Sequence, residues 1–180
     1  MKTATNTKAA RRRYLPSLAL MLATVTLLAF APQPVRAGPS YPFHARFITE
    51  FKSVVEFPYL HFTVNGQGRA TYMGPTTAIT TDQMVSMING SATATYTLTA
   101  DTMAGVRADT LILAMALQAT DVPGGITFTG TYTVTGGTGR FTGVTGSGVV
   151  AGSALLDGPK NGFGSFSLSG GISFGPGEKK

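Results

Sequence analysis

The sequence contains no cysteine and no tryptophan, and only two of its 180 residues are histidine. The lack of cysteine excludes disulfides, thiolate catalysis, iron–sulfur clusters and cysteine-based zinc sites. With His44 and His61 as the only histidines, a histidine-rich metal site is not expected either. Without tryptophan, an aromatic platform for a sugar would have to use tyrosine or phenylalanine. Any fold of this chain must therefore be held together by packing and hydrogen bonds alone.

The first 37 residues have the three-part pattern of a secretory signal peptide. The basic start ends in Arg11-Arg12-Arg13, the apolar run of 13 residues is Leu18–Phe30, and the cleavage sequence is Val35-Arg36-Ala37. This apolar run is shorter than the roughly 20 residues that a membrane-spanning helix needs. We therefore expect cleavage after Ala37, export to a secreted or periplasmic location, and no membrane insertion of the mature chain. The arginine run leaves the Sec and twin-arginine routes equally open.

Removal of this segment would change the charge of the protein. Six of the 14 basic residues and none of the 8 acidic residues lie in it, which leaves eight of each sign. The basic isoelectric point of about 9.8 is thus a property of the precursor. A neutral mature chain gives no support to binding of nucleic acid or of anionic membranes, which require a basic face.

Apolar and polar residues alternate along most of the remaining chain, as they do in strands with one buried face. The candidate strands are residues 44–57, 60–72, 76–82, 83–88, 91–100, 110–119, 126–135, 146–156 and 164–174. The dipeptide Asn89-Gly90 predicts a two-residue hairpin turn. Segment 110–119 is rich in Ala, Leu and Met, which favour a helix. Because Leu111, Leu113 and Leu117 alternate with other residues, we interpret it as a strand.

Eight or nine strands with short turns and no convincing helix predict an all-β domain, either a sandwich or an up-and-down barrel. Sixteen of the 23 glycines lie between Gly124 and Gly175, within strands as well as turns. Such glycines suit the sharp bends of a small closed sheet, and closure removes exposed edges. We therefore predict a single antiparallel up-and-down β-barrel of about eight strands at 44–174. A signal peptide at 1–37 and a flexible lead-in at 38–43 precede it, and a polar tail at 175–180 follows.

The most distinctive segment is a group of closely spaced glycines between two stretches in which apolar and polar residues alternate. Val134-Thr135-Gly136-Gly137-Thr138-Gly139-Arg140-Phe141, followed by Gly146, resembles the V-x-G-G-T-G-[KR]-F…G segment of dirigent proteins. It also resembles segments of bacterial secreted proteins of the allene-oxide-cyclase-like barrel group. Residues 65–74 are similar to a glycine-alternating stretch of those bacterial proteins, in which a histidine often occupies the position of Tyr72. Outside these two segments, the resemblance is limited to chain length and strand rhythm.

The resemblance implies an eight-stranded antiparallel barrel with a ligand-sized cavity, in a family whose plant members are often trimeric. It implies structural roles, as turn residues and a core aromatic, for Gly136, Gly137, Thr138, Gly139 and Phe141. Dirigent proteins steer phenoxy-radical coupling and allene oxide cyclases guide a cyclisation, both by confining a reactive substrate. Neither activity is carried over to this chain, because the acidic and arginine residues of dirigent pockets have no matching motif here.

The first candidate strand carries a set of charges of one parity: Arg46, Glu50, Lys52 and Glu56. If this face pointed into a barrel, Arg46 and Glu50 could act as a proton-transfer or anion-holding pair. If it points outward, it is a solvated face that needs no partner. Phe47 and Phe51, of the opposite parity, form a natural interior, and unpaired buried charge is costly. The outward orientation is therefore favoured.

His61 and Tyr72 complete the candidate pocket residues. His61 lies in a strand beside Tyr59, where it could act as an acid–base group, although surface histidines are more common. Tyr72 is a candidate because of its place in the family segment. No catalytic triad, cofactor motif or set of metal ligands accompanies these residues, so we predict no cofactor and no metal and assign no catalytic residue.

Three functions fit this sequence. The favoured one is a non-catalytic binding barrel that takes a small apolar or aromatic ligand in its interior. The second is an envelope or matrix protein without a small ligand, which would show an exposed apolar patch or a self-association interface. The third is a confining enzyme, a cyclase or isomerase, which would need a roomy lumen reached by a charged residue. A homo-oligomer, a trimer by family resemblance, is compatible with all three.

Overall fold

The structure, a computed structural model, describes residues 39–101, 108–157 and 160–175. Its strands are β1 (Ser40–Glu56), β2 (Tyr59–Ala70), β3 (Gly74–Ser86), β4 (Ser91–Ala100), β5 (Thr110–Val122), β6 (Gly125–Gly137), β7 (Thr145–Asp157) and β8 (Asn161–Ser173). A single 3₁₀ turn, η1 (Gly139–Phe141), joins β6 to β7. The predicted signal peptide and residues 176–180 of the predicted tail lie outside the described residues.

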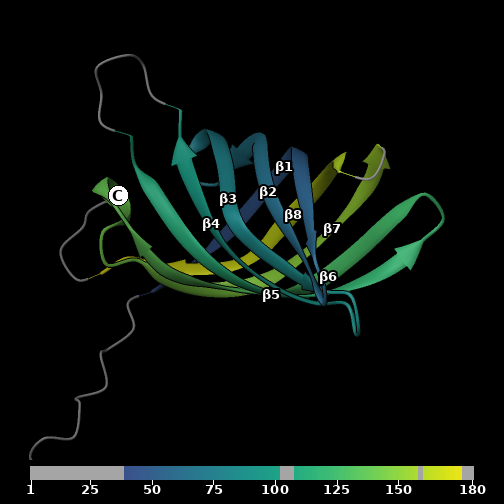
Figure 1. Cartoon of the computed structure of the whole chain (residues 1–180). Coiled ribbons are helices and arrows are strands. Elements are labelled where there is room, and N and C mark those ends of the chain that lie inside the picture. Colours follow the sequence, from purple (N-terminus) through teal and green to yellow (C-terminus); the bar gives the residue numbers. More distant parts are fainter. Residues whose placement is uncertain (1–38, 102–107, 158–159, 176–180) are drawn as a thin grey trace, which may run out of the picture. The chain divides into compact units, whose positions relative to one another are not determined.

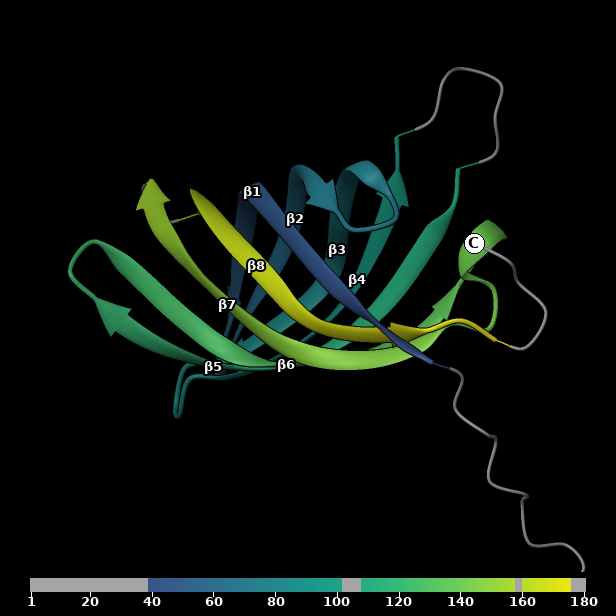
Figure 2. The ribbon, with the colours of Figure 1, turned by 180° about the vertical axis from the view of Figure 1, so that it is seen from behind.

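The eight strands form one closed, antiparallel, up-and-down barrel, as predicted. Each strand pairs with the next in the chain, and β1 pairs with β8 from Ser40↔Ser173 to Lys52↔Asn161. Figures 1 and 2 show the strands as long, strongly curved ribbons that follow one another in sequence order around the wall. The alternative of two packed sheets is therefore excluded, and segment 110–119 is confirmed as part of strand β5.

Two predicted boundaries differ from the structure. Residues 40–43, assigned to a flexible lead-in, form the start of β1; they pair with β8, and Phe43 is fully buried. The alternation of the first strand simply continues through this proline-containing stretch. The predicted strands at 76–82 and 83–88 are one strand, β3, whose register is irregular between Ile79 and Met84. Before the irregularity the even-numbered residues of β3 face inward, and after it the odd-numbered ones do. In the sequence this change looks like the boundary between two strands.

The predicted two-residue turn at Asn89-Gly90 is wrong, although the β3–β4 hairpin exists. Four residues, 87–90, connect the strands, and the Gly90 N–H donates to the Ser86 carbonyl oxygen (2.9 Å). The Asn89 side-chain oxygen accepts hydrogen bonds from the Ser91 N–H (3.0 Å) and hydroxyl (2.8 Å). Because the side chain makes this local turn, only Gly90 adopts a positive φ, of 70°.

Aromatic rings on the inner face lie over glycines of the neighbouring strand. In each pair the ring and the glycine are register partners: Phe47 with Gly68, Phe51 with Gly162, Phe128 with Gly152, and Tyr132 with Gly148. A Cβ added to any of these four glycines would overlap atoms of the partner ring. The glycines thus provide the space into which the rings pack, a known device of strongly bent sheets.

This arrangement predicts that Gly152→Ala destabilises the barrel. The new methyl group would meet both the Phe128 ring and the Ser165 carbonyl oxygen. We expect a loss of about 1–3 kcal/mol in the free energy of unfolding, the usual cost of overpacking. Chemical denaturation followed by tyrosine fluorescence or circular dichroism measures it.

Gly136→Ala is the matched control, because Gly136 also lies in a strand but a Cβ there would touch only the Ile112 side chain, at 3.7 Å. This variant should be neutral or slightly stabilising. Equal effects of the two substitutions would contradict the role given to the aromatic–glycine pairs.

Candidate functional site

The four candidate pocket residues lie apart and none of them reaches the barrel interior. Arg46 and Glu50 are exposed on the outer face of β1. His61 points outward from β2, with its Nε2 3.6 Å from a carboxylate oxygen of Glu56. Tyr72 lies in the β2–β3 turn, where its ring packs edge-on against Phe174 (5.9 Å between centroids). These residues therefore do not form one pocket.

The interior is filled by apolar side chains. The buried polar residues of the described chain are Thr49, Ser53, Thr76 and Thr80, and no charged side chain is buried there. A remaining cavity of about 30 Å³ lies among aromatic side chains that include Phe51, Phe62, Phe128 and Phe166. Such a volume corresponds to about one water molecule, whereas ligand pockets measure roughly 300–1,000 Å³.

Two interior tyrosines complete the description of the lumen. The Tyr96 hydroxyl donates to the side-chain oxygen of Gln83 (2.8 Å), whereas the buried Tyr132 hydroxyl has no hydrogen-bond partner among the described residues. Burial, together with the negative charge of Asp82, raises the pKa of Tyr96 far above its ordinary value. Burial alone raises the pKa of Tyr132 to about 12. Both phenols therefore stay neutral, and neither is suited to exchange protons near neutral pH.

The two ends of the barrel differ in how they are covered. At one end, which we call the plugged end, Phe174 contacts three aromatic rings: those of Tyr41 (5.9 Å), Tyr72 (5.9 Å) and Phe141 (6.1 Å between centroids). Phe141 is almost fully buried, as predicted for a core aromatic of the glycine segment. A cluster of four aromatic rings thus lies at this end of the barrel.

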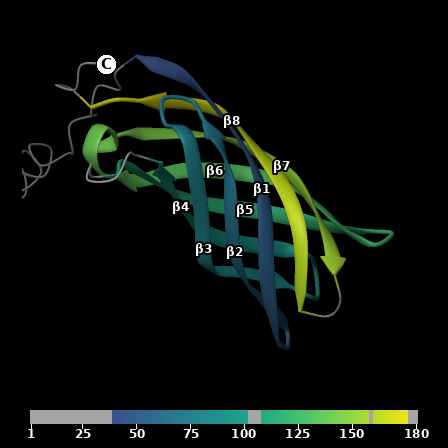
Figure 3. The same ribbon diagram turned by 90° about the horizontal axis from the view of Figure 1, so that it is seen from above.

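The other end, which we call the hairpin end, consists of the β1–β2, β3–β4, β5–β6 and β7–β8 connections and the residues that flank them. Eleven of the fifteen large apolar residues that are exposed in the described chain lie here: Val54, Val55, Phe57, Tyr59, Met84, Met87, Ile88, Val122, Leu155, Leu156 and Phe163. Phe57 and Ile88 are 80% and 75% exposed. In Figure 3 the tip of the β5–β6 hairpin lies at the right and the β1–β2 connection at the bottom, whereas the turn that follows β6 lies at the left. Exposed apolar residues are thus concentrated in the connections and strand ends at this end of the barrel.

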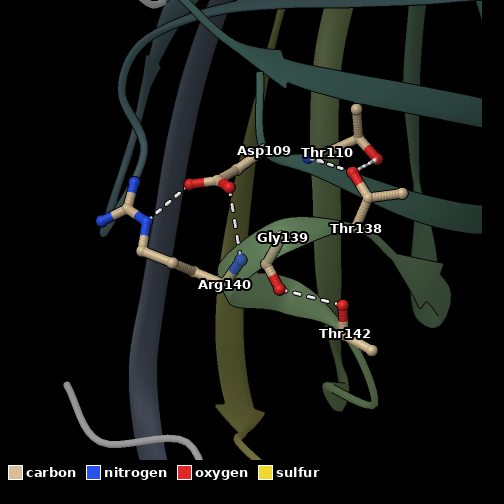
Figure 4. A network of polar contacts seen from close by, with 6 residues as sticks. All are labelled: Asp109, Thr110, Thr138, Gly139, Arg140 and Thr142. Atoms are coloured by element: carbon tan, nitrogen blue, oxygen red, sulfur yellow. Dashed lines mark hydrogen bonds and ion pairs between the residues drawn. The ribbon is translucent and has the colours of Figure 1, made fainter. Parts of the chain in front are cut away.

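The glycine segment forms the corner between β6 and β7 and is held by the start of β5 (Figure 4). One oxygen of the Asp109 carboxylate accepts from the Arg140 Nε (2.5 Å), and the other accepts from the Arg140 backbone N–H (3.2 Å). The hydroxyls of Thr110 and Thr138 are 2.9 Å apart. Gly139 has a φ of 59°, and a Cβ there would overlap the Asp109 carboxylate. Thr138, Gly139 and Arg140 therefore have structural contacts at the corner, whereas Gly136 and Gly137, expected as turn residues, lie at the end of strand β6. Asp109 is the partner that the sequence pattern did not reveal.

These contacts make the contribution of the corner to the free energy of unfolding depend on pH. The hydrogen bond from Arg140 lowers the pKa of Asp109, outweighing the opposite effect of burial. A carboxyl whose pKa is lower in the folded state stabilises the fold above its unfolded pKa of about 3.9, and this contribution is lost as the pH falls through the folded pKa. Asp109→Asn should therefore cost about 0.5–2 kcal/mol at neutral pH.

The difference in unfolding free energy between Asp109→Asn and the wild type should shrink as the pH is lowered from neutral through the folded pKa of Asp109, because the wild-type carboxyl then becomes neutral as well. Urea denaturation across this range measures it, with the exposed Asp121→Asn as the control. A difference that stays constant down to the lowest pH would rule out the assigned ion pair.

A second aspartate was missed by the sequence reading. Asp82 lies at the irregular part of β3 and accepts hydrogen bonds from the Thr80 hydroxyl (2.6 Å) and the Thr95 N–H (3.0 Å). Burial alone would raise the pKa of Asp82, but these hydrogen bonds outweigh it and lower the pKa. Asp82 and His61 line the same open groove of about 520 Å³ on the outer wall. Within the described residues, no group of three or more His, Asp or Glu side chains is arranged to hold a metal ion.

A scan against protein-family models and searches of curated proteins and of solved structures found no match to this chain. In the part of the chain that the structure describes, no helix has the length and hydropathy needed to cross a membrane.

Proposed function

We propose that this protein is an exported, non-catalytic binding module that takes uncharged apolar or aromatic ligands at the hairpin end of its barrel. The observation that carries the proposal is the concentration of eleven exposed large apolar side chains at this end, three in the connections (Phe57, Met87 and Ile88) and eight in the flanking strand ends. Exposed apolar clusters of this kind commonly mark binding surfaces. The remaining wall positions of β4–β8 are occupied mostly by Thr, Ser, Ala and Gly, so the hairpin end is distinct.

The packing of the lumen supports a ligand at the rim and not deep inside. Ile126 and Phe128 are half-buried at the inner edge of the hairpin end, and the cavity beneath them holds about 30 Å³. The charged residues nearby are of both signs. Three are carboxylates, Glu56, Asp121 and Asp157, and two are amines, Lys160 and Lys52, the register partner of Asn161. Because carboxylates are at least as numerous as amines, an anionic ligand gains nothing at this end, which favours a neutral one.

Export and family membership belong to the same proposal. The basic and apolar N-terminal pattern of residues 1–37 supports a cleaved signal peptide and a secreted or periplasmic location. The glycine segment at 134–141 supports a relation to the allene-oxide-cyclase-like and dirigent-like barrels. Arg46 and Glu50 lie outside the barrel, and this favours a binding protein over a confining enzyme, because a confining enzyme needs charge within its lumen.

Binding of a neutral dye tests the hairpin end. Nile red should bind the wild type with a rise in fluorescence, and Ile88→Ser should weaken its affinity about fivefold or more, because the loss of one apolar contact is worth about 1 kcal/mol or more. Phe57→Ser should act in the same direction. Competition with uncharged aromatic and aliphatic compounds then identifies the preferred ligand class.

The chain offers matched controls on the outer wall. Ile48 is 75% exposed, as is Ile88, and Val149 is 58% exposed against 59% for Val55. Ile48→Ser and Val149→Ser should leave dye affinity unchanged, whereas Val55→Ser should reduce it. If the wall variants reduce affinity as much as the hairpin variants do, or if no dye binds, the proposed site is wrong.

A second candidate function is self-association through the wall formed by β4–β8. The only charged residues in these five strands are Asp121 and Asp157, within the last two residues of β5 and β7. A wall without charge resembles the core of a protein–protein interface. Sedimentation should then give a mass that rises with concentration, and Thr131→Lys should reduce it while Thr63→Lys on β2 does not. A constant monomer mass would exclude this candidate.

A further inference from the structure

A separate groove crosses the outer wall where β7, β8, β1 and β2 lie side by side. It has a volume of about 890 Å³, and its outward-facing residues include Arg46, Ile48, Gln67, Arg69, Ser165 and Ser167. The strand register arranges them in two adjacent rows, Ser167–Arg46–Arg69 and Ser165–Ile48–Gln67. The groove therefore brings together side chains from strands at opposite ends of the chain.

The feature that distinguishes this groove is a pair of arginines directly opposite each other. Arg46 and Arg69 are register partners, so their Cβ atoms are about 4.5–5.5 Å apart, an arrangement in which like charges destabilise a sheet. Within the described ranges, the ion pairs are His61–Glu56 and Arg140–Asp109, and neither the Arg46 nor the Arg69 side chain has a hydrogen bond or ion pair.

No carboxylate of the described residues forms an ion pair with either arginine, although that of Asp101 lies on the neighbouring part of the wall, where it accepts a hydrogen bond from Thr77 (3.2 Å), the register partner of Gln67. On the outer face of β1 the nearest is Glu50, four residues from Arg46 and therefore about 13 Å along the strand. The facing positions of β8 and β7 carry serine and alanine. Two unpaired guanidinium groups thus share one concave surface, which is an electrostatic cost that a bound anion would remove.

The other side chains of the groove indicate what kind of ligand carries the anionic group. Guanidinium groups bind phosphate, sulfate and carboxylate through paired N–H donors. The Ser167 hydroxyl donates to the Ala151 carbonyl oxygen (3.4 Å), which leaves Ser165 and Gln67 as neutral polar partners. The groove is larger than a single oxyanion, and its polar lining suits a hydroxylated ligand body.

We propose that Arg46 and Arg69 form a binding site for the phosphate or sulfate group of a small hydroxylated ligand, such as a sugar phosphate. Each guanidinium contributes N–H donors to the anion, which neutralises the repulsion between the two side chains. Ser165 and Gln67 bind the uncharged part of the ligand. The site lies on the outer wall and is independent of the apolar hairpin end.

The test uses inorganic phosphate and glucose 6-phosphate as probes, with sodium chloride of equal ionic strength as the reference. Both probes should raise the melting temperature of the wild type more than sodium chloride does, and glucose 6-phosphate should bind more tightly by calorimetry. Glucose alone and acetate should have weaker effects. If the probes do no more than sodium chloride, the proposal is wrong.

Substitutions of the two arginines distinguish a specific anion-binding site from a nonspecific effect of positive charge. Arg46→Thr and Arg69→Thr should each weaken phosphate binding by about tenfold or more, the usual effect of losing a charged hydrogen-bond partner. Without an anion, each should leave the melting temperature unchanged or raise it, because the repulsion is relieved. Arg46→Lys, which retains the charge but not the paired donors, should bind phosphate with intermediate affinity.

Lys52→Thr is the matched control, because Lys52 is a cation on the same face of β1 but outside the groove. It should not change the response to phosphate. An equal loss of phosphate binding in Lys52→Thr and Arg46→Thr, or unchanged binding in both arginine variants, would overturn the proposal.

Discussion

The barrel depends on aromatic rings packed against glycines of the adjacent strand. Because the register places Phe47, Phe51, Phe128 and Tyr132 opposite glycines, the inner face alternates between large side chains and none at all. Eight strands enclose an interior just wide enough to be filled by side chains, and these pairs fill it while the backbone stays strongly curved. The same glycines that would weaken a flat strand are therefore required for this closed one.

Filling the interior in this way determines where chemistry can occur. The cavity among the aromatic side chains of the lumen measures about 30 Å³, and no charged side chain of the described residues is buried. The surface carries two chemically different regions. The hairpin end offers apolar side chains with mixed charges beside them, and the outer groove offers two unpaired arginines.

Much of this architecture could be predicted from the sequence, because alternation of apolar and polar residues shows which face of a strand is buried and which is exposed. The Phe47 and Phe51 parity correctly predicted an apolar interior and an outward position for Arg46 and Glu50 in β1. Features that depend on register were not accessible. Arg69 faces Arg46, and Asp109 reaches Arg140, only because strands distant in the chain are aligned in one particular way. The reversal of parity near Asp82 falls where two adjoining strands, 76–82 and 83–88, were predicted instead of the single strand β3.

The geometry of β1 also determines how the two surface regions relate to each other. This strand carries Arg46 in the groove and Val54 at the hairpin end, eight residues further on. At about 3.3 Å per residue the two positions are some 26 Å apart. A small ligand cannot touch both, so an apolar compound and a phosphorylated one would occupy the protein together without competition. Only an elongated amphiphile with an anionic head and a tail of comparable length could bridge the two regions, and it would have to pass Glu50 and Lys52 on the same face. Those two exposed charges favour water over a hydrocarbon chain, and the two regions are for that reason better understood as independent sites.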